Sequence, residues 1–249
     1  MPMAKTRTLN SPGACAGAIR KFLKHGGSEE HAAGVQSFFK EEIRSHGWYT
    51  AALRRAAVQW RRALLGSHKL EFLLSVADRL FTGRNLEEKV FAVLMLEKIA
   101  QEFGDREFSL FESWLNRISS WADYDGLVHY LIAPMIYAEP KRMPRVFRWA
   151  KSSDRWHRRA ACVALIHGVR RQKFFGEVTR LSGRLLADHD DMVQKGLGWL
   201  VREAVKASPR RMVPYLMRIR SRAPRLVLRT ACETLASGQR ARILTQRLQ

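Results

Sequence analysis

Residues 190–207 read DDMVQKGLGWLVREAVKA, and this stretch decides the fold class. Its apolar side chains recur at three- and four-residue spacing, which is the period of an amphipathic helix. Asp190 precedes the first apolar residue of the pattern, where the capping residue of a helix stands. The stretch therefore predicts a helix that begins at Asp191.

The same helical period covers nearly the whole chain, and no stretch alternates convincingly as a strand would. Helix-start signals precede the periodic segments. They are Ser28, Thr50, Asn85 with Glu88 three residues on, Asp105, Asp154, and Ser208 followed by Pro209. The sequence therefore predicts an all-α protein of about a dozen helices joined by short polar links.

A second pattern includes Lys195. It consists of a charged residue that is usually followed by a small residue and then by an apolar segment. It recurs at intervals of 34, 36, 34, 36 and 34 residues. Such periods are typical of helical-repeat solenoids, in which equivalent helices stack side by side. A coincidence of helix lengths is the alternative. The series residues, as we call them, are Arg55, Lys89, Asp125, Arg159, Lys195 and Arg229.

We expect the five cations of the series to lie on one concave surface, with Asp125 among them. This predicts one helical-repeat domain of about six helical pairs over residues 28–249. Residues 1–27 are predicted to be an N-terminal extension, either poorly ordered or one short helix. The extension has positive charge but no continuous apolar segment, unlike a signal peptide. A mitochondrial presequence is the alternative to the interpretation that we favour, the frayed N-terminus of a cytoplasmic protein.

The charge of the chain is strongly positive and unevenly distributed. The 249 residues include 44 Lys+Arg and 23 Asp+Glu, a formal net charge of +21, and Arg outnumbers Lys 32 to 12. Residues 125–249 contain 26 of the cations and nine of the acids. The electrostatic field of so many cations predicts a polyanionic partner. The planar guanidinium group of arginine suits phosphate, because it can donate two parallel hydrogen bonds. Nucleic acid is the partner that we expect, and a basic surface without a partner is the alternative.

Several classes of protein are excluded by what the sequence lacks. The three cysteines, Cys15, Cys162 and Cys232, are far apart, which argues against a disulfide framework or a zinc site. The eight histidines show no metal-ligand spacing, and no apolar run approaches the roughly 20 residues that span a bilayer. Walker, GxSxG, HExxH and dinucleotide-loop motifs are absent. We therefore predict no metal, no cofactor and no membrane association.

Two tryptophans share the helical phase of the series. Trp121 and Asp125 are four residues apart, so an indole and a carboxylate share one helix face, and Ser119-Ser120 precede them as caps. Trp199 stands one turn beyond Lys195, and Arg159 lies on the repeat between. We expect these side chains to converge on one stretch of the groove. The alternative is that both tryptophans are core residues and that Asp123 or Asp125 only caps a helix.

Three motifs resemble those of the DNA alkylation repair glycosylases of the AlkD-like family. WADYD at 121–125 resembles the family's Trp-x-x-x-Asp, and RWHRRAA at 155–161 resembles its Trp-x-x-Arg-Ala-Ala, with the functional arginine at Arg159. QKGLGWLVRE at 194–203 resembles its Gln-Lys-x-x-Gly-Trp-x-x-Arg-Glu, with the second tryptophan at Trp199. The resemblance spans about residues 28–235 and is weak before residue 110. The sequence departs from the family pattern at the turn that begins at Gly47, which lacks the family's proline. The resemblance is also loose around Phe38, the position at which we look for an aromatic residue near the damaged base.

The resemblance implies a C-shaped stack of HEAT-like helical pairs and removal of cationic N3- or N7-alkylpurines from duplex DNA, with the base left in the stack. Relatives that lack the acid and the indole bind structured DNA without catalysis; the presence of both places this chain among the enzymes. The residues expected to act in catalysis are Asp125, Trp121 and Trp199. The residues expected to bind DNA are Arg159, Lys195, Arg158, Arg202, Arg229, Lys89 and Arg55.

The expected protein is an intracellular, nucleoid-associated monomer of the cytoplasm without an obligate protein partner. Two other functions stay open at this point. A non-catalytic binder of damaged or branched DNA has the same charge and fold and differs at Trp121 and Asp125. A protein-interaction solenoid predicts no salt-sensitive affinity for DNA.

Overall fold

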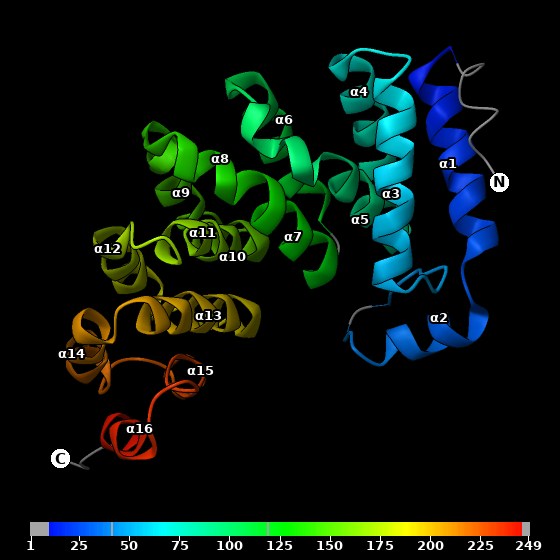
Figure 1. The fold of residues 1–249 in the computed structure, drawn as a ribbon. Helices are drawn as coiled ribbons and strands as arrows, with labels where there is room; N and C mark the ends of the chain where they lie inside the picture. Colours follow the sequence, from blue (N-terminus) through cyan, green and yellow to red (C-terminus); the bar gives the residue numbers. More distant parts are fainter. Residues whose placement is uncertain (1–9, 41, 119, 246–249) are drawn as a thin grey trace. The chain divides into compact units, whose positions relative to one another are not determined.

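A computed structural model describes residues 10–40, 42–118 and 120–245 (Figure 1). Every regular element among these residues is a helix, which confirms the predicted all-α fold. None of the described helices is long and apolar enough to cross a membrane. The chain divides into two compact units, Met1–Leu131 and Ile132–Gln249, which are described separately below.

Unit 1 contains seven α-helices and two 3-10 helices among its described residues: α1 (Pro12–Gly26), α2 (Glu29–Gln36), α3 (Thr50–Leu65), α4 (Leu70–Phe81), α5 (Leu86–Leu96), η2 (Glu97–Glu102), α6 (Asp105–Trp114), η3 (Leu115–Arg117) and α7 (Trp121–Leu127). Helix α1 lies within the predicted N-terminal extension. It buries Cys15, Ala16, Ile19 and Leu23 and packs against α4, so this part of the extension belongs to the core of unit 1.

A π-helix, η4 (Val128–Ile132), follows α7 at the boundary between the units. Unit 2 continues with α8 (Ala133–Ala138), η5 (Pro140–Arg142), α9 (Met143–Trp149), α10 (Arg155–Val163), α11 (Ile166–Val169), α12 (Phe175–Leu185), α13 (Asp191–Ala207), α14 (Pro209–Ile219), α15 (Arg225–Ala231) and α16 (Ser237–Leu244).

The helices that carry the series residues stack consecutively within each unit. In unit 1, α3 packs against α5 and α5 packs against α7; in unit 2, α10 packs against α13 and α13 against α15 (Figure 1). We call these six the series helices. Their stacking confirms that the interval of 34 or 36 residues relates equivalent helices of a repeat.

A second layer of helices covers one side of the series helices in unit 2. Helices α9, α12 and α14 form this second layer: α9 and α12 pack on α10, and α12 and α14 pack on α13 (Figure 1). Because α10, α15 and the second layer surround α13 on three sides, one stripe of α13 remains exposed.

Helix starts follow the capping signals of the sequence. The side chains of Ser28, Asn85, Asp154 and Asp190 each accept a hydrogen bond from a backbone N–H in the first turn of their helix. Helices α3 and α6 instead begin at the predicted cap residue itself, so their N-caps are one residue earlier. Ser119, predicted as a cap of α7, lies outside the described residues.

The turn at Gly47 is stabilised without a proline. Gly47 has a φ of +76°, and a Cβ there would collide with the carbonyl oxygen of Ser28. The buried carboxylate of Glu87 accepts hydrogen bonds from the backbone N–H groups of His46, at 2.9 Å, and Gly47, at 3.0 Å. The carboxylate of α5 thereby fixes the turn that leads into α3.

Two glycines let the series helices of unit 2 approach closely. An added Cβ at Gly196 would lie 3.1 Å from Cγ of Arg159 on α10, and one at Gly198 would lie 2.8 Å from Cβ of Thr230 on α15. Both glycines belong to the QKGLGW motif. The motif therefore has a packing role on both sides of α13.

Gly198→Ala is expected to lower the free energy of unfolding by about 1–3 kcal/mol, because the Cβ of Thr230 is fixed to its backbone and cannot rotate away. Gly183 of α12 is the matched control, since an added Cβ there meets nothing within 4 Å. Gly183→Ala is expected to stabilise by up to about 1 kcal/mol through helix propensity. Urea unfolding measures both; equal effects of the two substitutions would contradict the close packing of α13 and α15.

Candidate functional site

Helix α7 places an indole and a carboxylate one turn apart in unit 1. Trp121 is its first residue and Asp125 lies four residues later, and both side chains are partly exposed. Phe39 stacks on Trp121, with ring centroids 4.8 Å apart and an angle of 16° between the planes. The indole is thus held on one side by an aromatic ring from a segment far away in sequence.

The aromatic residue beside Trp121 is Phe39 and not Phe38, where the sequence led us to look. Phe38 is 73% exposed. The two residues are neighbours, so hydrophobicity does not distinguish them. Which of them meets α7 is decided by the path of the backbone after α2.

A buried ion pair fixes α7 on α5. Nζ of Lys89 donates to Oδ2 of Asp123 at 2.8 Å and to the carbonyl oxygen of Arg117 at 2.6 Å. Lys89 is 4% exposed and Asp123 is 1% exposed. The other carboxylate oxygen of Asp123 accepts from the backbone N–H and the hydroxyl of Ser120, at 2.8 and 2.7 Å. Asp123 therefore caps α7 and neutralises Lys89.

The placement of Lys89 corrects the expectation that it contacts DNA. Its ammonium is buried and engaged with Asp123, so it is not presented on a surface. Arg55, the other cation of the series in unit 1, is exposed on α3.

In unit 2 the exposed stripe of α13 carries one indole and three cations. Lys195, Trp199, Arg202 and Lys206 follow one another at four-, three- and four-residue intervals, and all are at least partly exposed. Lys195 pairs with Asp191 at 3.1 Å, and Nη1 of Arg202 donates to Glu233 at 2.5 Å. Arg229 is exposed on the neighbouring α15. Lys195, Trp199, Arg202 and Arg229 thus lie on adjacent series helices of unit 2.

Arg159 is buried between α10 and α13, which corrects its expected place on the surface. It is 5% exposed, and its Nη1 donates to the carbonyl oxygen of Met192 at 2.8 Å. The absent side chain of Gly196 makes room for its Cγ. In this structure Arg159 joins two repeats.

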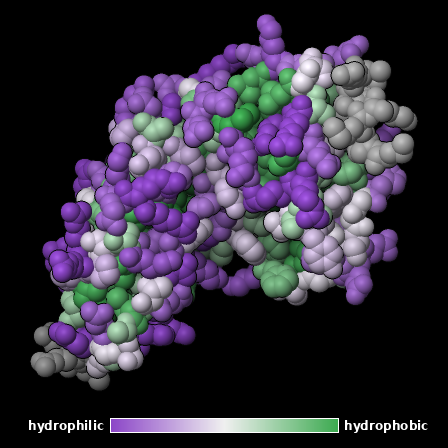
Figure 2. All heavy atoms as spheres, in the orientation of Figure 1, coloured by the Kyte–Doolittle hydropathy of each residue, from purple (hydrophilic) through white to green (hydrophobic). Residues whose placement is uncertain are grey.

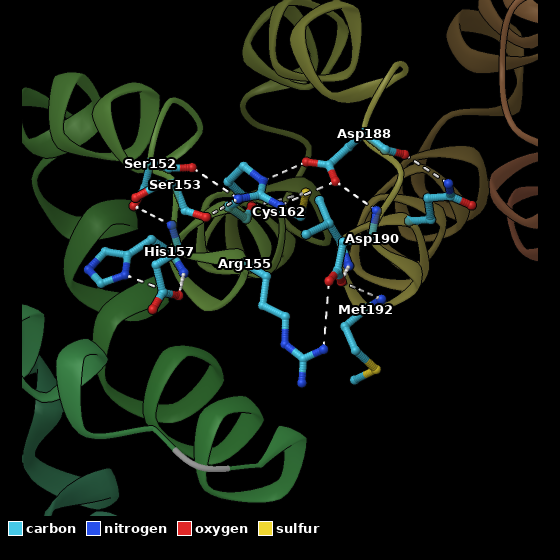
Figure 3. A network of polar contacts seen from close by, with 12 residues as sticks. Ser152, Ser153, Arg155, His157, Cys162, Asp188, Asp190 and Met192 are labelled. Atoms are coloured by element: carbon cyan, nitrogen blue, oxygen red, sulfur yellow. Dashed lines mark hydrogen bonds and ion pairs between the residues drawn. The ribbon is translucent and has the colours of Figure 1, made fainter. Parts of the chain in front are cut away.

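Arg158 is also engaged within the protein, in a polar network with Asp188, Ser152 and Ser153, which are labelled in Figure 3. Its Nε donates to Oδ2 of Asp188 at 2.6 Å, and its Nη1 donates to the carbonyl oxygens of Ser152 and Ser153. Asp188 in turn accepts from the backbone N–H of Asp190 at 3.0 Å. The network joins the N-terminus of α10 to the loop before α13, a role that the motif alone does not show.

Two titratable groups near these residues have shifted pKa values. Burial raises the pKa of the Cys162 thiol to about 12, although the charge of Arg159 opposes this shift. Burial alone would raise the pKa of Glu203, but its hydrogen bond and attraction to Arg170, helped by Lys206 and Arg202, lower it overall. Cys162 is therefore protonated and unreactive at neutral pH, and Glu203 is a structural anion.

Trp121 and Asp125 belong to unit 1, whereas Arg159, Lys195, Trp199, Arg202 and Arg229 belong to unit 2. Their convergence on one groove remains a prediction. Among the described residues no group of three or more His, Cys, Asp or Glu side chains is arranged to hold a metal ion. Helix α7 presents the Asp125 carboxylate one turn from the indole that stacks on Phe39.

Comparisons with known proteins agree with this architecture. The model of the DNA alkylation repair enzyme family matches residues 19–235. A predicted DNA alkylation repair enzyme from Enterococcus faecalis has a similar structure, with a TM-score of 0.75 at 17% identity over 85% of this chain and 97% of that one. AlkD2 from Streptococcus mutans gives a TM-score of 0.59 at 18% identity over 84% and 99%. No curated protein matches the chain.

The two structural likenesses, below 20% identity, concern the fold alone, whereas the family match covers most of the sequence. It includes the motifs at α7, α10 and α13. The chain belongs to the DNA alkylation repair enzyme family.

Proposed function

We propose that this protein is a monofunctional DNA glycosylase that hydrolyses the N-glycosidic bond of cationic N3- or N7-alkylated purines in duplex DNA. The observation that supports this best is the pair formed by Trp121 and Asp125 on α7, both partly exposed. Phe39 holds the indole, and the pair of Lys89 and Asp123 holds the helix.

The chemistry suits a site with one carboxylate. An alkylpurine with a formal positive charge is already a good leaving group and needs little protonation. As its bond to C1′ breaks, the sugar becomes oxocarbenium-like, and a fixed carboxylate such as Asp125 stabilises that charge and orients the attacking water. The faces of Trp121 and Trp199 attract cationic groups. We also propose that the alkylated base stays stacked in the duplex during the reaction, as the resemblance implies.

The test of this proposal is the release of 7-methylguanine from methylated duplex DNA by the purified protein. We expect release under single-turnover conditions and none above background from a matched duplex that contains uracil. Uracil is neutral and lacks the leaving-group charge that this site requires. Binding of the methylated duplex without release would favour the second candidate function, a non-catalytic binder of damaged or branched DNA, which the basic surface of unit 2 also suits.

DNA binding is expected to be independent of sequence and to weaken steeply with salt. Lys195→Ala is expected to reduce the slope of log affinity against log salt by about one, because Lys195 is an exposed cation of the α13 stripe. Arg159→Ala is expected to lower stability instead, because its guanidinium is buried against Met192. Fluorescence anisotropy over a range of salt concentrations measures the slopes. An unchanged slope in Lys195→Ala would remove this residue from the interface.

A further inference from the structure

The second layer of unit 2 forms a basic surface separate from the series helices. Helices α9, α12 and α14 contain seven arginines, no lysine, and a single acid, Glu177. In Figure 2 hydrophilic residues gather along the edge of unit 2 where α12 lies. Since α12 and α14 pack on α13, the exposed stripe of α13 faces away from them. The exposed arginines of the second layer are Arg148, Arg180, Arg184, Arg210, Arg211 and Arg218.

Aromatic rings hold several of these arginines in place. The guanidinium carbons of Arg180 and Arg184 on α12 lie 4.9 and 5.9 Å from the ring centre of Phe147 on α9. Arg211 on α14 lies 5.2 Å from the ring centre of Phe175 on α12. Helices α12 and α14 thus each place arginine over an aromatic ring of the preceding helix of the second layer.

This arrangement suits a phosphate backbone. A guanidinium over a ring face loses little further freedom on binding, and the N–H groups at its edge can still make bidentate contacts with phosphate. Arg180 also pairs with Glu177 on its own helix, at 3.2 Å. Arg184, Arg210, Arg211 and Arg218 are exposed, and Glu177 is the one acid of these three helices. The second layer therefore carries a large surplus of positive charge.

The composition of the second layer favours nucleic acid over a membrane. A surface that binds lipid combines cations with exposed apolar side chains that insert. The exposed large hydrophobic residues in the described part of the chain, Phe38, Tyr49, Leu65 and Tyr130, all belong to unit 1. The exclusive use of arginine in these three helices also matches the fork geometry of phosphodiesters.

We propose that the second layer of unit 2 binds a second segment of duplex DNA, so that one molecule bridges two duplexes. This inference rests on the proposed function in one respect: it assumes that the substrate duplex binds to the series helices. The arginine–ring contacts join α12 to α9 and α14 to α12, so the arginines of successive helices can follow one phosphate backbone.

The experiment uses the full-length protein and two unrelated duplexes, one immobilised on beads and the other fluorescent. We expect the wild-type protein to retain the fluorescent duplex on the beads. The variant Arg184→Glu/Arg211→Glu/Arg218→Glu is expected to retain at least tenfold less. Its affinity for a single methylated duplex and its release of 7-methylguanine are expected to stay within about twofold of wild type. Circular dichroism shows whether charge reversal impairs folding. If it does, the neutral variant with Gln at the same three positions replaces the Glu variant, and the same loss of bridging is expected.

The matched control is Lys21→Glu/Lys24→Glu/Arg62→Glu, which makes the same change of charge at exposed positions of unit 1. It is expected to bridge as the wild type does. Absence of bridging by the wild-type protein, or an equal loss in both Glu variants, would overturn the proposal. Binding to phosphatidylserine vesicles that depends on the same three arginines, with bridging unchanged, would overturn it in favour of a lipid partner. If bridging depends on the three arginines but the protein releases no 7-methylguanine, the proposed function is rejected and the bridging proposal stands.

Discussion

Asp125→Asn is expected to slow the release of 7-methylguanine by about 10²–10³-fold, the usual effect of losing one preorganised electrostatic contact with a transition state. Asparagine keeps the shape of the side chain and most of its hydrogen bonding but removes the charge that stabilises the oxocarbenium in the proposed mechanism. Single-turnover kinetics on methylated duplex DNA measure the effect.

Affinity for DNA is expected to hold or to rise in Asp125→Asn, because an acid near phosphates is repulsive. The control is Glu29→Gln, which removes one exposed negative charge from α2 of the same unit and should leave the rate unchanged. Release at the wild-type rate by Asp125→Asn would show that the carboxylate is not catalytic, and the binding protein would then be the better interpretation.

Asp123→Asn is expected to destabilise the protein by about 3–5 kcal/mol, because it leaves the ammonium of Lys89 buried without its counter-charge. Asp123 lies two residues before Asp125, so the two carboxylates point to different sides of α7. The side chain of Asp123 is the one that meets Lys89 on α5. Urea unfolding measures the loss.

The double variant Lys89→Met/Asp123→Asn separates the charge from other effects. It removes the buried ammonium while asparagine keeps an acceptor for Ser120, so it should recover most of the lost stability. Asp191→Asn is the matched control, since its pair with Lys195 is exposed, and it should change stability by less than about 1 kcal/mol. A double variant as unstable as Asp123→Asn alone would mean that the pair does not hold α7 in place.

The all-α fold and the series helices could be predicted because helical periodicity and caps are local properties of the sequence. Lys195 illustrates this: its helix, its cap Asp190 and its place in the repeat all follow from nearby residues. The exposure of each series cation could not be predicted in the same way. Lys89 and Lys195 occupy equivalent positions, yet one is buried against Asp123 and the other is exposed beside Asp191.

Phe39 could not be identified for a similar reason. Its contact with Trp121 joins residues 82 positions apart, and no local pattern distinguishes Phe39 from Phe38. A stronger signal existed for Asp123, because Ser120 and Asp123 have the spacing of a capping box. The partner of Arg158, Asp188, lies in a loop. Residue spacing in a loop does not predict which side chains meet.

The glycine contacts of α13 have a consequence for the cooperativity of unit 2. In a repeat stack, stability is a sum of terms for single repeats and for the interfaces between neighbours. Gly196 and Gly198 lie at the two interfaces of one helix, toward α10 and toward α15. Those interfaces join three successive repeats through α13. We therefore expect α10, α13 and α15 to unfold together rather than repeat by repeat.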